Sequence, residues 1–235
     1  VTLWNSAPAL ASLLAEEGAA APSVRAFLLS GDWIPLALPE ALLRLAPDAE
    51  VVSLGGATEG SIWSIFHRVA AEDDKGRSIP YGRPLPGQDI LILDNAGQNC
   101  PDWQIGEIHI AGAGVADGYA NDPQRTAAVF VDHPVHGRIY CTGDRGRRLP
   151  GGVVEFLGRT DNQVKLHGHR VELGEVEHLL ENAPGIREGA VCVQDPDRRA
   201  RLIAHVTLEE NAPASWRQDT IAALKNALPY YMVPE

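Results

Sequence analysis

The spacing of apolar residues predicts a strand, a helix and a second strand near the start of the chain. Residues 24–30 (VRAFLLS) form an apolar run closed by Gly31, which is the pattern of a buried strand. Residues 39–46 begin with a proline at a helix start and place their leucines near one face. Residues 51–54 (VVSL) are a second short strand. This order favours a parallel α/β sheet over about residues 1–80.

Between about residues 80 and 160, a β-rich pattern replaces the alternation of strands and helices. Short apolar segments of strand type are separated there by turns of glycine, proline and asparagine. The expected strands span residues 89–94, 106–112, 138–143 and 153–158. We therefore expect a β-rich subdomain after the α/β portion.

The last stretch predicts a small α+β unit of roughly 70 residues, near the size of a domain that can fold alone. Its expected elements are a helix at 172–182, strands at 187–193 and 201–208, and a helix after Ser215. Gln218 stands where a capping-box partner of Ser215 would lie, and Pro229 ends the helix.

Composition narrows the classes of partner. The chain has 235 residues, of which 45% are hydrophobic, and a formal net charge of -11. An acidic chain argues against nucleic acid, because phosphate binding needs a basic face. No apolar run approaches the roughly 18 residues that a membrane span requires, and no signal peptide is visible. Since the sequence opens at Val1 without a methionine, we expect a piece of a longer polypeptide.

The three cysteines carry no metal-binding pattern. Cys100, Cys141 and Cys192 are far apart, odd in number and match no ligand spacing. We expect ordinary thiols in a reducing cytoplasm. His167 and His169 form a His-x-His pair, but no further ligands cluster beside them in the sequence.

Two short segments could bind a nucleotide. GGATEG at 55–60 follows a strand, so its glycines would let the backbone approach a ligand, with an anion favoured at a following helix. Thr58 could then bind phosphate and Glu59 a metal ion such as Mg²⁺. A plain glycine turn before a capped helix explains the same residues. Asp144, in the Thr-Gly-Asp turn of 140–152, could accept two ribose hydroxyls, although aspartate is common in turns.

Two further segments are rich in glycine or charge. Residues 158–177 mix Arg159, Asp161 and Lys165 with two histidines and glycines before an acidic helix start. Such density favours a functional loop, while a solvated hairpin remains the alternative. GAGVADGY at 112–119 has the wrong spacing for a dinucleotide loop and lacks a βαβ unit around it, so we interpret it as a packed β-turn.

Taken together and in this order, these segments resemble the adenylation domains of nonribosomal peptide synthetases over essentially the whole chain. The segment LGGATE (54–59) is similar to the family pattern Asn-x-Tyr-Gly-Pro-Thr-Glu, and YCTGD (140–144) matches Tyr-x-Thr-Gly-Asp. Further matches are GEIHIAGAGVADGY (106–119), the hinge motif at 158–177 and LPYYMVP (228–234). The resemblance implies the fold of the superfamily of acyl- and aryl-CoA ligases, adenylation domains and luciferases.

The resemblance also implies a domain division. Residues 1–160 would be the C-terminal part of the large adenylation core, and residues 161–235 a small mobile α+β subdomain that stops before the catalytic lysine segment. Asp161 would be the hinge about which the small subdomain rotates between two half-reactions.

The implied reaction uses ATP and Mg²⁺. A substrate carboxylate attacks the α-phosphorus of ATP to give an aminoacyl-AMP and pyrophosphate, and the acyl group then moves to the phosphopantetheine thiol of a carrier domain. Thr58 would contact phosphate, Glu59 would hold Mg²⁺, and Asp144 with Arg159 would bind the ribose. The remaining nucleotide contacts would come from Gly31, Gly55, Gly56 and Ala57.

The family order also places a substrate pocket and partners. The lining positions would be Asn5, Leu28, Ser30, Leu54, Ile62 and Trp63. This set resembles cysteine-activating domains, especially those of pyochelin- and yersiniabactin-type siderophore synthetases. Its apolar members suit a small side chain, and Ser30 or Asn5 a thiol. Implied partners are a carrier domain, a condensation or heterocyclisation domain, and a small MbtH-like activator protein.

Three departures from the family pattern accompany the matches. The phosphate loop that precedes this region and the pocket aspartate for the substrate amine are absent from the sequence. The usual tyrosine and proline of the first motif are Gly55 and Ala57 here, which leaves adenine stacking on that tyrosine unsupported. We expect this chain alone to be inactive. Two alternatives stay open: a degenerate docking half-domain without catalysis, and a related acyl- or aryl-acid ligase.

Overall fold

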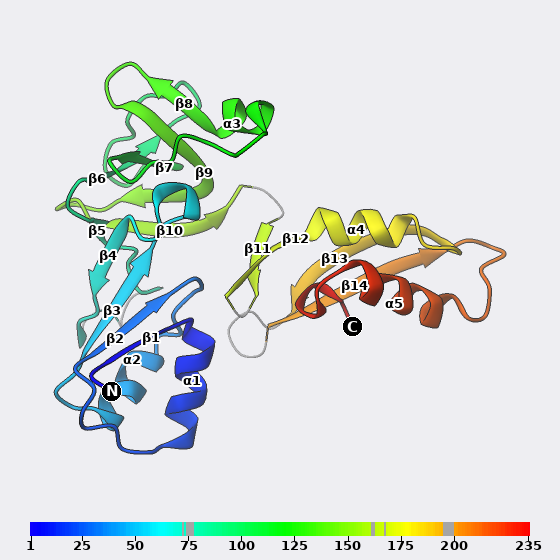
Figure 1. The fold of residues 1–235 in the computed structure, drawn as a ribbon, viewed down its shortest axis with the longest axis horizontal. Coiled ribbons are helices and arrows are strands. Elements are labelled where there is room, and N and C mark those ends of the chain that lie inside the picture. Colours follow the sequence, from blue (N-terminus) through cyan, green and yellow to red (C-terminus); the bar gives the residue numbers. More distant parts are fainter. Residues whose placement is uncertain (72, 74–77, 161–162, 167, 195–199) are drawn as a thin grey trace. The chain divides into compact units, whose positions relative to one another are not determined.

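The structure is a computed structural model that describes residues 1–71, 73, 78–160, 163–166, 168–194 and 200–235. The chain divides into two compact units, Val1–Thr160 and Asp161–Glu235 (Figure 1). Each unit has hydrophobic clusters made from its own residues. The assignment of the units as adenylation core and small subdomain stays a prediction.

A five-stranded sheet opens the first unit, in the order β1-β2-β3-β4-β5. Its strands are β1 (Leu3–Ser6), β2 (Ala26–Ser30), β3 (Glu50–Gly55), β4 (Ile65–Arg68) and β5 (Arg83–Pro84). The first three strands are parallel, but β4 pairs antiparallel with β3 and β5 antiparallel with β4. The expected parallel sheet is therefore a mixed one.

Two helices cover one face of this sheet. These are α1 (Pro8–Glu17) and α2 (Leu38–Leu45), and both have proline in the first turn, where a missing N–H costs no hydrogen bond. Phe27 and Leu29 of β2 are fully buried in the same cluster as Ala11 and Leu42 of the helices. Because side chains alternate along a strand, Leu28 and Ser30 face the opposite side of the sheet.

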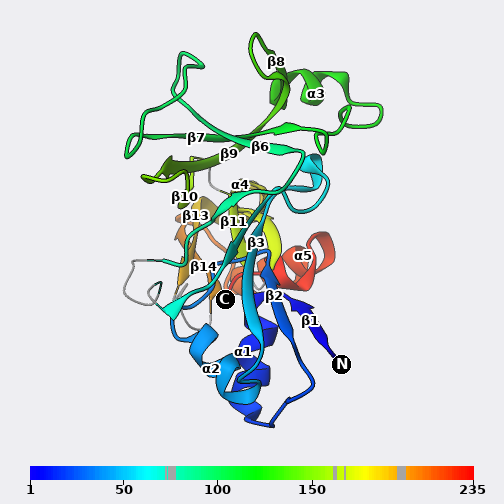
Figure 2. The same cartoon turned by 90° about the vertical axis from the view of Figure 1, so that its left-hand side faces the viewer.

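The second sheet confirms the β-rich portion. Its order is β10-β9-β7-β6, with β8 paired to β9, and all these pairs are antiparallel. Its strands run across the direction of β2 and β3 (Figure 2). The elements are β6 (Gln88–Leu93), β7 (Ile105–Gly112), α3 (Pro123–Val129), β8 (Phe130–His133), β9 (Gly137–Arg148) and β10 (Val154–Arg159).

The second unit is the α+β unit that the sequence predicts. Helices α4 and α5 pack beside a long antiparallel ribbon of β13 and β14, around the fully buried Val176 (Figure 1). Its elements are β11 (Gln163–Leu166), β12 (His169–Glu172), α4 (Leu173–Glu181), β13 (Ile186–Gln194), β14 (Arg201–Leu208), α5 (Trp216–Ala227) and the 3₁₀ turn η3 (Tyr230–Met232).

Two local expectations are wrong. Ser215 precedes α5 but does not cap it with its side chain, because its backbone is helical and its hydroxyl donates to Asp219 at 2.7 Å instead. The glycine motif leads into a three-residue 3₁₀ turn, η1 (Thr58–Gly60), rather than a helix. Ser61 then adopts a left-handed φ of 79°, and the chain returns as β4.

Candidate nucleotide site

The glycine motif forms a tight loop between β3 and β4. The Ser64 N–H donates to the carbonyl of Gly55 at 2.8 Å, which closes the loop. Gly56 has a φ of 148°, and a Cβ there would lie 2.7 Å from the Ser64 nitrogen, so only glycine fits. The Gly56 N–H donates to the Tyr81 hydroxyl at 3.0 Å. A backbone hydrogen bond and the Tyr81 hydroxyl therefore hold this loop without any α-helix.

Thr58 and Glu59 differ in exposure although they are neighbours. Thr58 is exposed, whereas Glu59 is only 7% exposed. The Tyr119 hydroxyl donates to Glu59 Oε1 at 2.5 Å. Burial and this carboxylate raise the pKa of Tyr119, so the phenol keeps its proton at neutral pH and serves as a donor. The arrangement fixes one face of the carboxylate and leaves Thr58 available to a ligand.

The loop at 112–119 packs directly onto the glycine motif. The Ala116 N–H donates to the Glu59 carbonyl at 2.8 Å, and the Ser61 hydroxyl donates to the Gly114 carbonyl at 3.0 Å. This loop is a packed turn, as the sequence indicates, and it also delivers Tyr119 to Glu59. Tyr119 is a functional candidate that the sequence reasoning missed, although it ends one of the quoted motifs.

Asp144 and Arg159 form a buried ion pair between adjacent strands. They are direct Cα partners in the β9–β10 ladder, and Arg159 Nη1 lies 2.6 Å from Asp144 Oδ1. The two side chains are only 10% and 13% exposed, respectively. Hydrogen bonds to charged groups at such burial are strong and well oriented. A carboxylate held in this way is suited to accept vicinal hydroxyl groups.

The turn that presents Asp144 is held from the neighbouring strand. The Thr142 hydroxyl donates to the Ile108 carbonyl at 2.6 Å and accepts from the Asp144 N–H at 3.0 Å. Gly143 has a φ of 73°, and its N–H donates to Glu107 Oε1 at 3.1 Å. Glu107 thus supports the position of Asp144 from β7.

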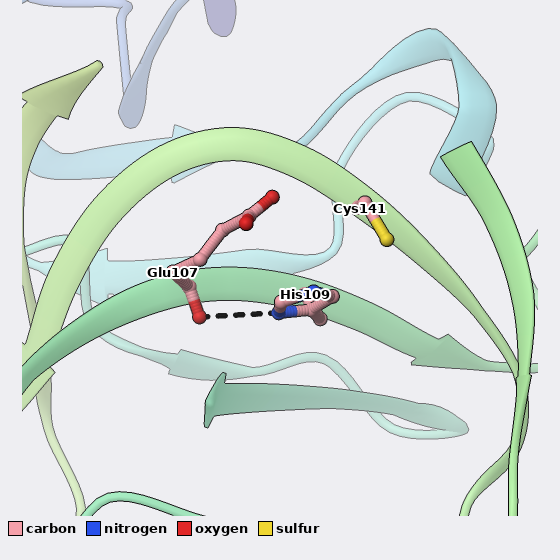
Figure 3. A group of neighbouring side chains, drawn as sticks. All are labelled: Glu107, His109 and Cys141. Atoms are coloured by element: carbon pink, nitrogen blue, oxygen red, sulfur yellow. Dashed lines mark hydrogen bonds between the residues drawn. The ribbon is translucent and has the colours of Figure 1, made fainter. Parts of the chain in front are cut away.

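Glu107 also belongs to a group of three possible metal ligands with His109 and Cys141, whose donor atoms lie within 4.8 Å of one another (Figure 3). His109 Nδ1 contacts the Glu107 carbonyl at 3.1 Å. Burial lowers the pKa of His109, while burial and the Glu107 charge raise the pKa of Cys141 to about 11. The thiol therefore keeps its proton at neutral pH, and a metal would have to displace it. The Glu107 carboxylate instead accepts a hydrogen bond from the Gly143 N–H through Oε1.

Tyr81 lies between the two halves of this site. Its hydroxyl contacts Gly56, and its ring lies 5.6 Å from Phe156 of β10, measured between ring centroids. Burial is the main cause that raises the pKa of Tyr81, with the Asp144 carboxylate second and the Arg159 guanidinium opposing. Tyr81 therefore contacts the glycine loop and packs against β10, the strand that carries Arg159. Nothing in the local sequence around Tyr81 signals this role.

Four of the six pocket positions lie together on one sheet face. Asn5 and Leu28 are Cα partners across β1 and β2, and Ser30 and Leu54 are partners across β2 and β3. This is the face opposite to α1 and α2. Ile62 and Trp63 follow η1 in the loop, where the Ile62 side chain is 64% exposed and Trp63 is half-buried.

The end of β2 supplies the remaining nucleotide candidate. Gly31 is exposed, with a left-handed φ of 89°, and the following Trp33 is 49% exposed. Trp33 lies 5.0 Å from Phe156 between ring centroids. A shallow depression with a volume of about 310 Å³ opens beside these two rings and Ile105. Asp161, which the sequence predicts as a hinge, lies outside the described residues.

A magnesium ion bound with a nucleotide fits the donors in this unit. Mg²⁺ prefers carboxylate oxygen and is often held by one or two carboxylates together with substrate phosphates. Glu59 offers such an oxygen donor in an oriented position beside the exposed Thr58. The type of ligand atom and its position next to Thr58 therefore both suit Mg²⁺.

Comparisons with known proteins point to one family. The family model described as AMP-binding enzyme matches residues 1–120. Pyochelin synthetase PchF of Pseudomonas aeruginosa (strain UCBPP-PA14) is 47% identical over 229 residues, which cover 95% of this chain and 12% of that protein. The chain thus spans about an eighth of the length of this relative.

Solved structures give the same result for the fold. Holo-PA1221, an NRPS protein containing adenylation and PCP domains, matches with a TM-score of 0.86 and 31% identity over 100% of this chain and 40% of its own. The Vibrio cholerae adenylation domain AlmE, in complex with glycyl-adenosine-5'-phosphate, matches with a TM-score of 0.84 and 26% identity over 100% of this chain and 46% of its own. The predicted superfamily fold is confirmed. Among the described residues, no helix is long and apolar enough to cross a membrane.

Proposed function

Since the chain belongs to the AMP-binding enzyme family and has the fold of NRPS adenylation domains, we propose that it is part of an ATP-dependent ligase that converts an amino acid to its aminoacyl-AMP. The observation that carries the proposal is the position of Tyr81. It contacts Gly56 of the glycine loop, and its ring packs against Phe156 of β10, the strand that also carries Arg159. The glycine loop and the Asp144–Arg159 pair belong to one compact unit, which supports their proposed roles as phosphate loop and ribose pair.

The nucleotide would be bound from both sides of Tyr81. Asp144 would accept the ribose hydroxyls, and Arg159 would hold that carboxylate in place through its 2.6 Å contact. The exposed Thr58 would donate to a phosphate oxygen. Gly31, Gly55, Gly56 and Ala57 would let backbone approach the ligand closely. Glu59 would hold Mg²⁺, which when bound offsets the charge of the phosphates.

The chemical step needs positioning and charge stabilisation rather than covalent catalysis. The amino-acid carboxylate oxygen forms a bond to the α-phosphorus, the bond to the bridging oxygen breaks, and pyrophosphate leaves with the electron pair. A rigid loop and an oriented ion pair suit such a reaction, because most of its acceleration comes from holding the reactants in line. Residues 55–59 and the Asp144–Arg159 pair supply this rigidity here.

L-Cysteine is the proposed substrate. Asn5, Leu28, Ser30 and Leu54 share one sheet face, which gives an apolar wall with two small polar groups. A thiol is satisfied by weak partners, whereas the hydroxyl of serine would lose strong hydrogen bonds to water. Ile62 and Trp63 would complete the pocket. Similarity to a pyochelin synthetase supports a role in siderophore peptide synthesis.

The second proposed step is transfer of the acyl group to a carrier domain as a thioester on phosphopantetheine. The similarity to an NRPS protein containing adenylation and PCP domains supports a carrier partner. Rotation of the second unit about Asp161 would separate the two steps. A condensation or heterocyclisation domain, an MbtH-like activator and a cytoplasmic location remain part of this proposal.

The proposal is tested by amino-acid-dependent exchange of pyrophosphate into ATP. It is measured on the full-length protein, meaning the longer polypeptide of which this chain is proposed to be a part. We expect exchange with L-cysteine among the proteinogenic amino acids, and its loss in Asp144→Ala. Asp132→Ala, which removes an exposed aspartate of β8, is the matched control and should keep full exchange. Exchange with aryl or fatty acids alone would indicate a related acid ligase. No exchange with any acid from folded protein would favour the docking half-domain.

A further inference from the structure

Gly55 is a glycine for an unusual reason. Its φ lies outside the left-handed region, so its backbone conformation admits any residue. A Cβ at this position would, however, lie 1.8 Å from Tyr81 Cε2 and 2.4 Å from Tyr81 Cζ. Nonbonded carbon atoms cannot approach each other so closely. The Tyr81 ring therefore occupies the space into which a side chain at position 55 would project.

Three contacts fix the Tyr81 ring in that space. The Tyr81 hydroxyl accepts from the Gly56 N–H at 3.0 Å, and the backbone N–H of Tyr81 donates to the Val154 carbonyl at 2.9 Å. Phe156 packs against it with the ring planes tilted by 47°. Tyr81 is half-buried. It bridges β3, which carries the glycine motif, and β10, which carries Arg159.

The ring also lies beside the polar groups of the nucleotide site. It packs against Phe156 of β10, and Arg159 on the same strand pairs with Asp144 of β9. The Asp144 carboxylate raises the pKa of the Tyr81 hydroxyl and the Arg159 guanidinium lowers it. The aromatic ring of Tyr81 thus lies against the glycine loop and against the strand that carries Arg159. A nucleobase attached to that ribose would meet an aromatic face within reach, and bases stack on aromatic side chains regardless of their hydrogen-bonding pattern.

We propose that Tyr81 forms the aromatic wall of the nucleotide site, in the place left by the side chain that is absent at Gly55, and that the adenine ring of ATP packs against it. The inference rests on the proposed function for the identity of the nucleotide. It makes residues 55 and 81 a coupled pair, in which one aromatic ring can come from either position but not from both. The pair restores the aromatic group that the departure at Gly55 removes.

Exchanging the two side chains tests this coupling in the full-length protein. Tyr81→Ala should raise the KM for ATP on the order of tenfold, which is the usual size of a lost base–aromatic stack, and leave the KM for the amino acid unchanged. Gly55→Tyr alone should be worse, because two rings compete for one space. The double variant Gly55→Tyr/Tyr81→Ala should recover ATP binding to within a few-fold of the unaltered protein. Tyr81→Phe keeps the ring but removes the hydrogen bond from the Gly56 N–H, so it should raise the KM for ATP less than Tyr81→Ala does. Trp103→Ala, which removes an exposed aromatic side chain away from the proposed site, is the matched control and should stay near the unaltered KM.

Calorimetric binding of ATP, and thermal unfolding of each variant and of the unaltered protein, separate this inference from the proposed function. The inference would be wrong if the double variant bound ATP no better than Tyr81→Ala. It would also be wrong if Trp33→Ala weakened ATP binding and Tyr81→Ala did not. Pyrophosphate exchange that does not change in the Tyr81 variants would support the proposed function and contradict the role of Tyr81. Tyr81-dependent ATP binding without exchange would support the wall and contradict the proposed reaction.

Discussion

The hydroxyl of Tyr119 lies 2.5 Å from Oε1 of Glu59, and this contact joins two motifs that are 60 residues apart. Tyr119 is held in turn by its neighbours, since its N–H donates to Thr126 Oγ1 at 2.9 Å. The Glu59 carboxylate is therefore oriented by the fold before any ligand arrives. Preorganisation of this kind lowers the cost of binding a cation and the phosphates that accompany it.

Tyr119→Phe removes that hydrogen bond and keeps the ring. Loss of a hydrogen bond to a charged group costs about 1.5–3 kcal/mol, so we expect a lower unfolding temperature. We also expect a several-fold higher Mg²⁺ concentration for half-maximal pyrophosphate exchange, because Glu59 would have to be oriented during binding. The measurements are thermal unfolding and a Mg²⁺ titration. An unchanged Mg²⁺ requirement would show that Tyr119 has only a structural role.

The Asp144–Arg159 pair should show strong coupling. Removing either partner takes the counter-charge from a group whose side chain is only 10–13% exposed, and we expect each single alanine variant to lose about 3–5 kcal/mol of unfolding free energy. The double variant Asp144→Ala/Arg159→Ala should lose less than the sum, since no charge then stays behind. Urea unfolding of the four proteins measures this coupling. Additive losses would contradict it.

Cys141 should make the protein sensitive to alkaline pH. Its pKa is raised from 9.0 to about 11, first by burial and then by Glu107, so the fold favours the protonated thiol. The corresponding stability is fully present below pH 9 and is lost as pH rises towards 11. Cys141→Ala should therefore show a shallower decline of unfolding free energy between pH 9 and 11. Cys192→Ala, at an exposed position, should keep the original slope.

Long apolar runs made much of the fold predictable. β2, β6 and β14 are found where continuous apolar or alternating segments predicted them. The short edge strand β1 was missed, because four residues with mixed exposure give no periodic signal. The helix expected after Glu59 fails because Ser61 turns the chain back. Local patterns fix local elements, while long-range packing decides how those elements end.

The candidate site was predictable only in part for the same reason. Motifs identify Thr58, Glu59, Asp144 and Arg159 because these residues stand within short patterns. The contact of Gly55 with Tyr81 joins positions 26 residues apart on different elements, and no spacing rule connects them. The sequence shows only a glycine at the end of a strand, and the structure is needed to see that the backbone there does not require one.

The core of the second unit should be separable from that of the first. Leu180 is 2% exposed and packs in a cluster made only of residues from 166 onwards. Leu180→Ala should cost about 2–5 kcal/mol, a large share of the stability of a unit this small. Hydrogen exchange should then rise in the described segments after residue 163 and stay unchanged in residues 1–160. Equal loss of protection in both units would show that they unfold as one.

Gly82 offers a direct test of how Tyr81 is positioned, with Gly87 as its matched control. Both glycines have left-handed φ angles, 111° and 81°, so alanine carries a backbone penalty of about 1–3 kcal/mol at each. They differ in their surroundings. A Cβ at Gly82 would lie 1.9 Å from the Phe66 carbonyl oxygen, whereas nothing lies within 4 Å of one at Gly87.

The extra cost of Gly82→Ala over Gly87→Ala therefore measures the packing of this segment against β4 and β10. The carbonyl of Gly82 accepts from the Val154 N–H at 2.7 Å, so relief of the clash must shift the backbone that anchors the Tyr81 ring. We expect Gly82→Ala to be less stable than Gly87→Ala by at least about 2 kcal/mol. Its binding of ATP should also weaken, while that of Gly87→Ala stays unchanged. Similar stability and ATP binding in the two variants would show that Tyr81 keeps its place without this glycine.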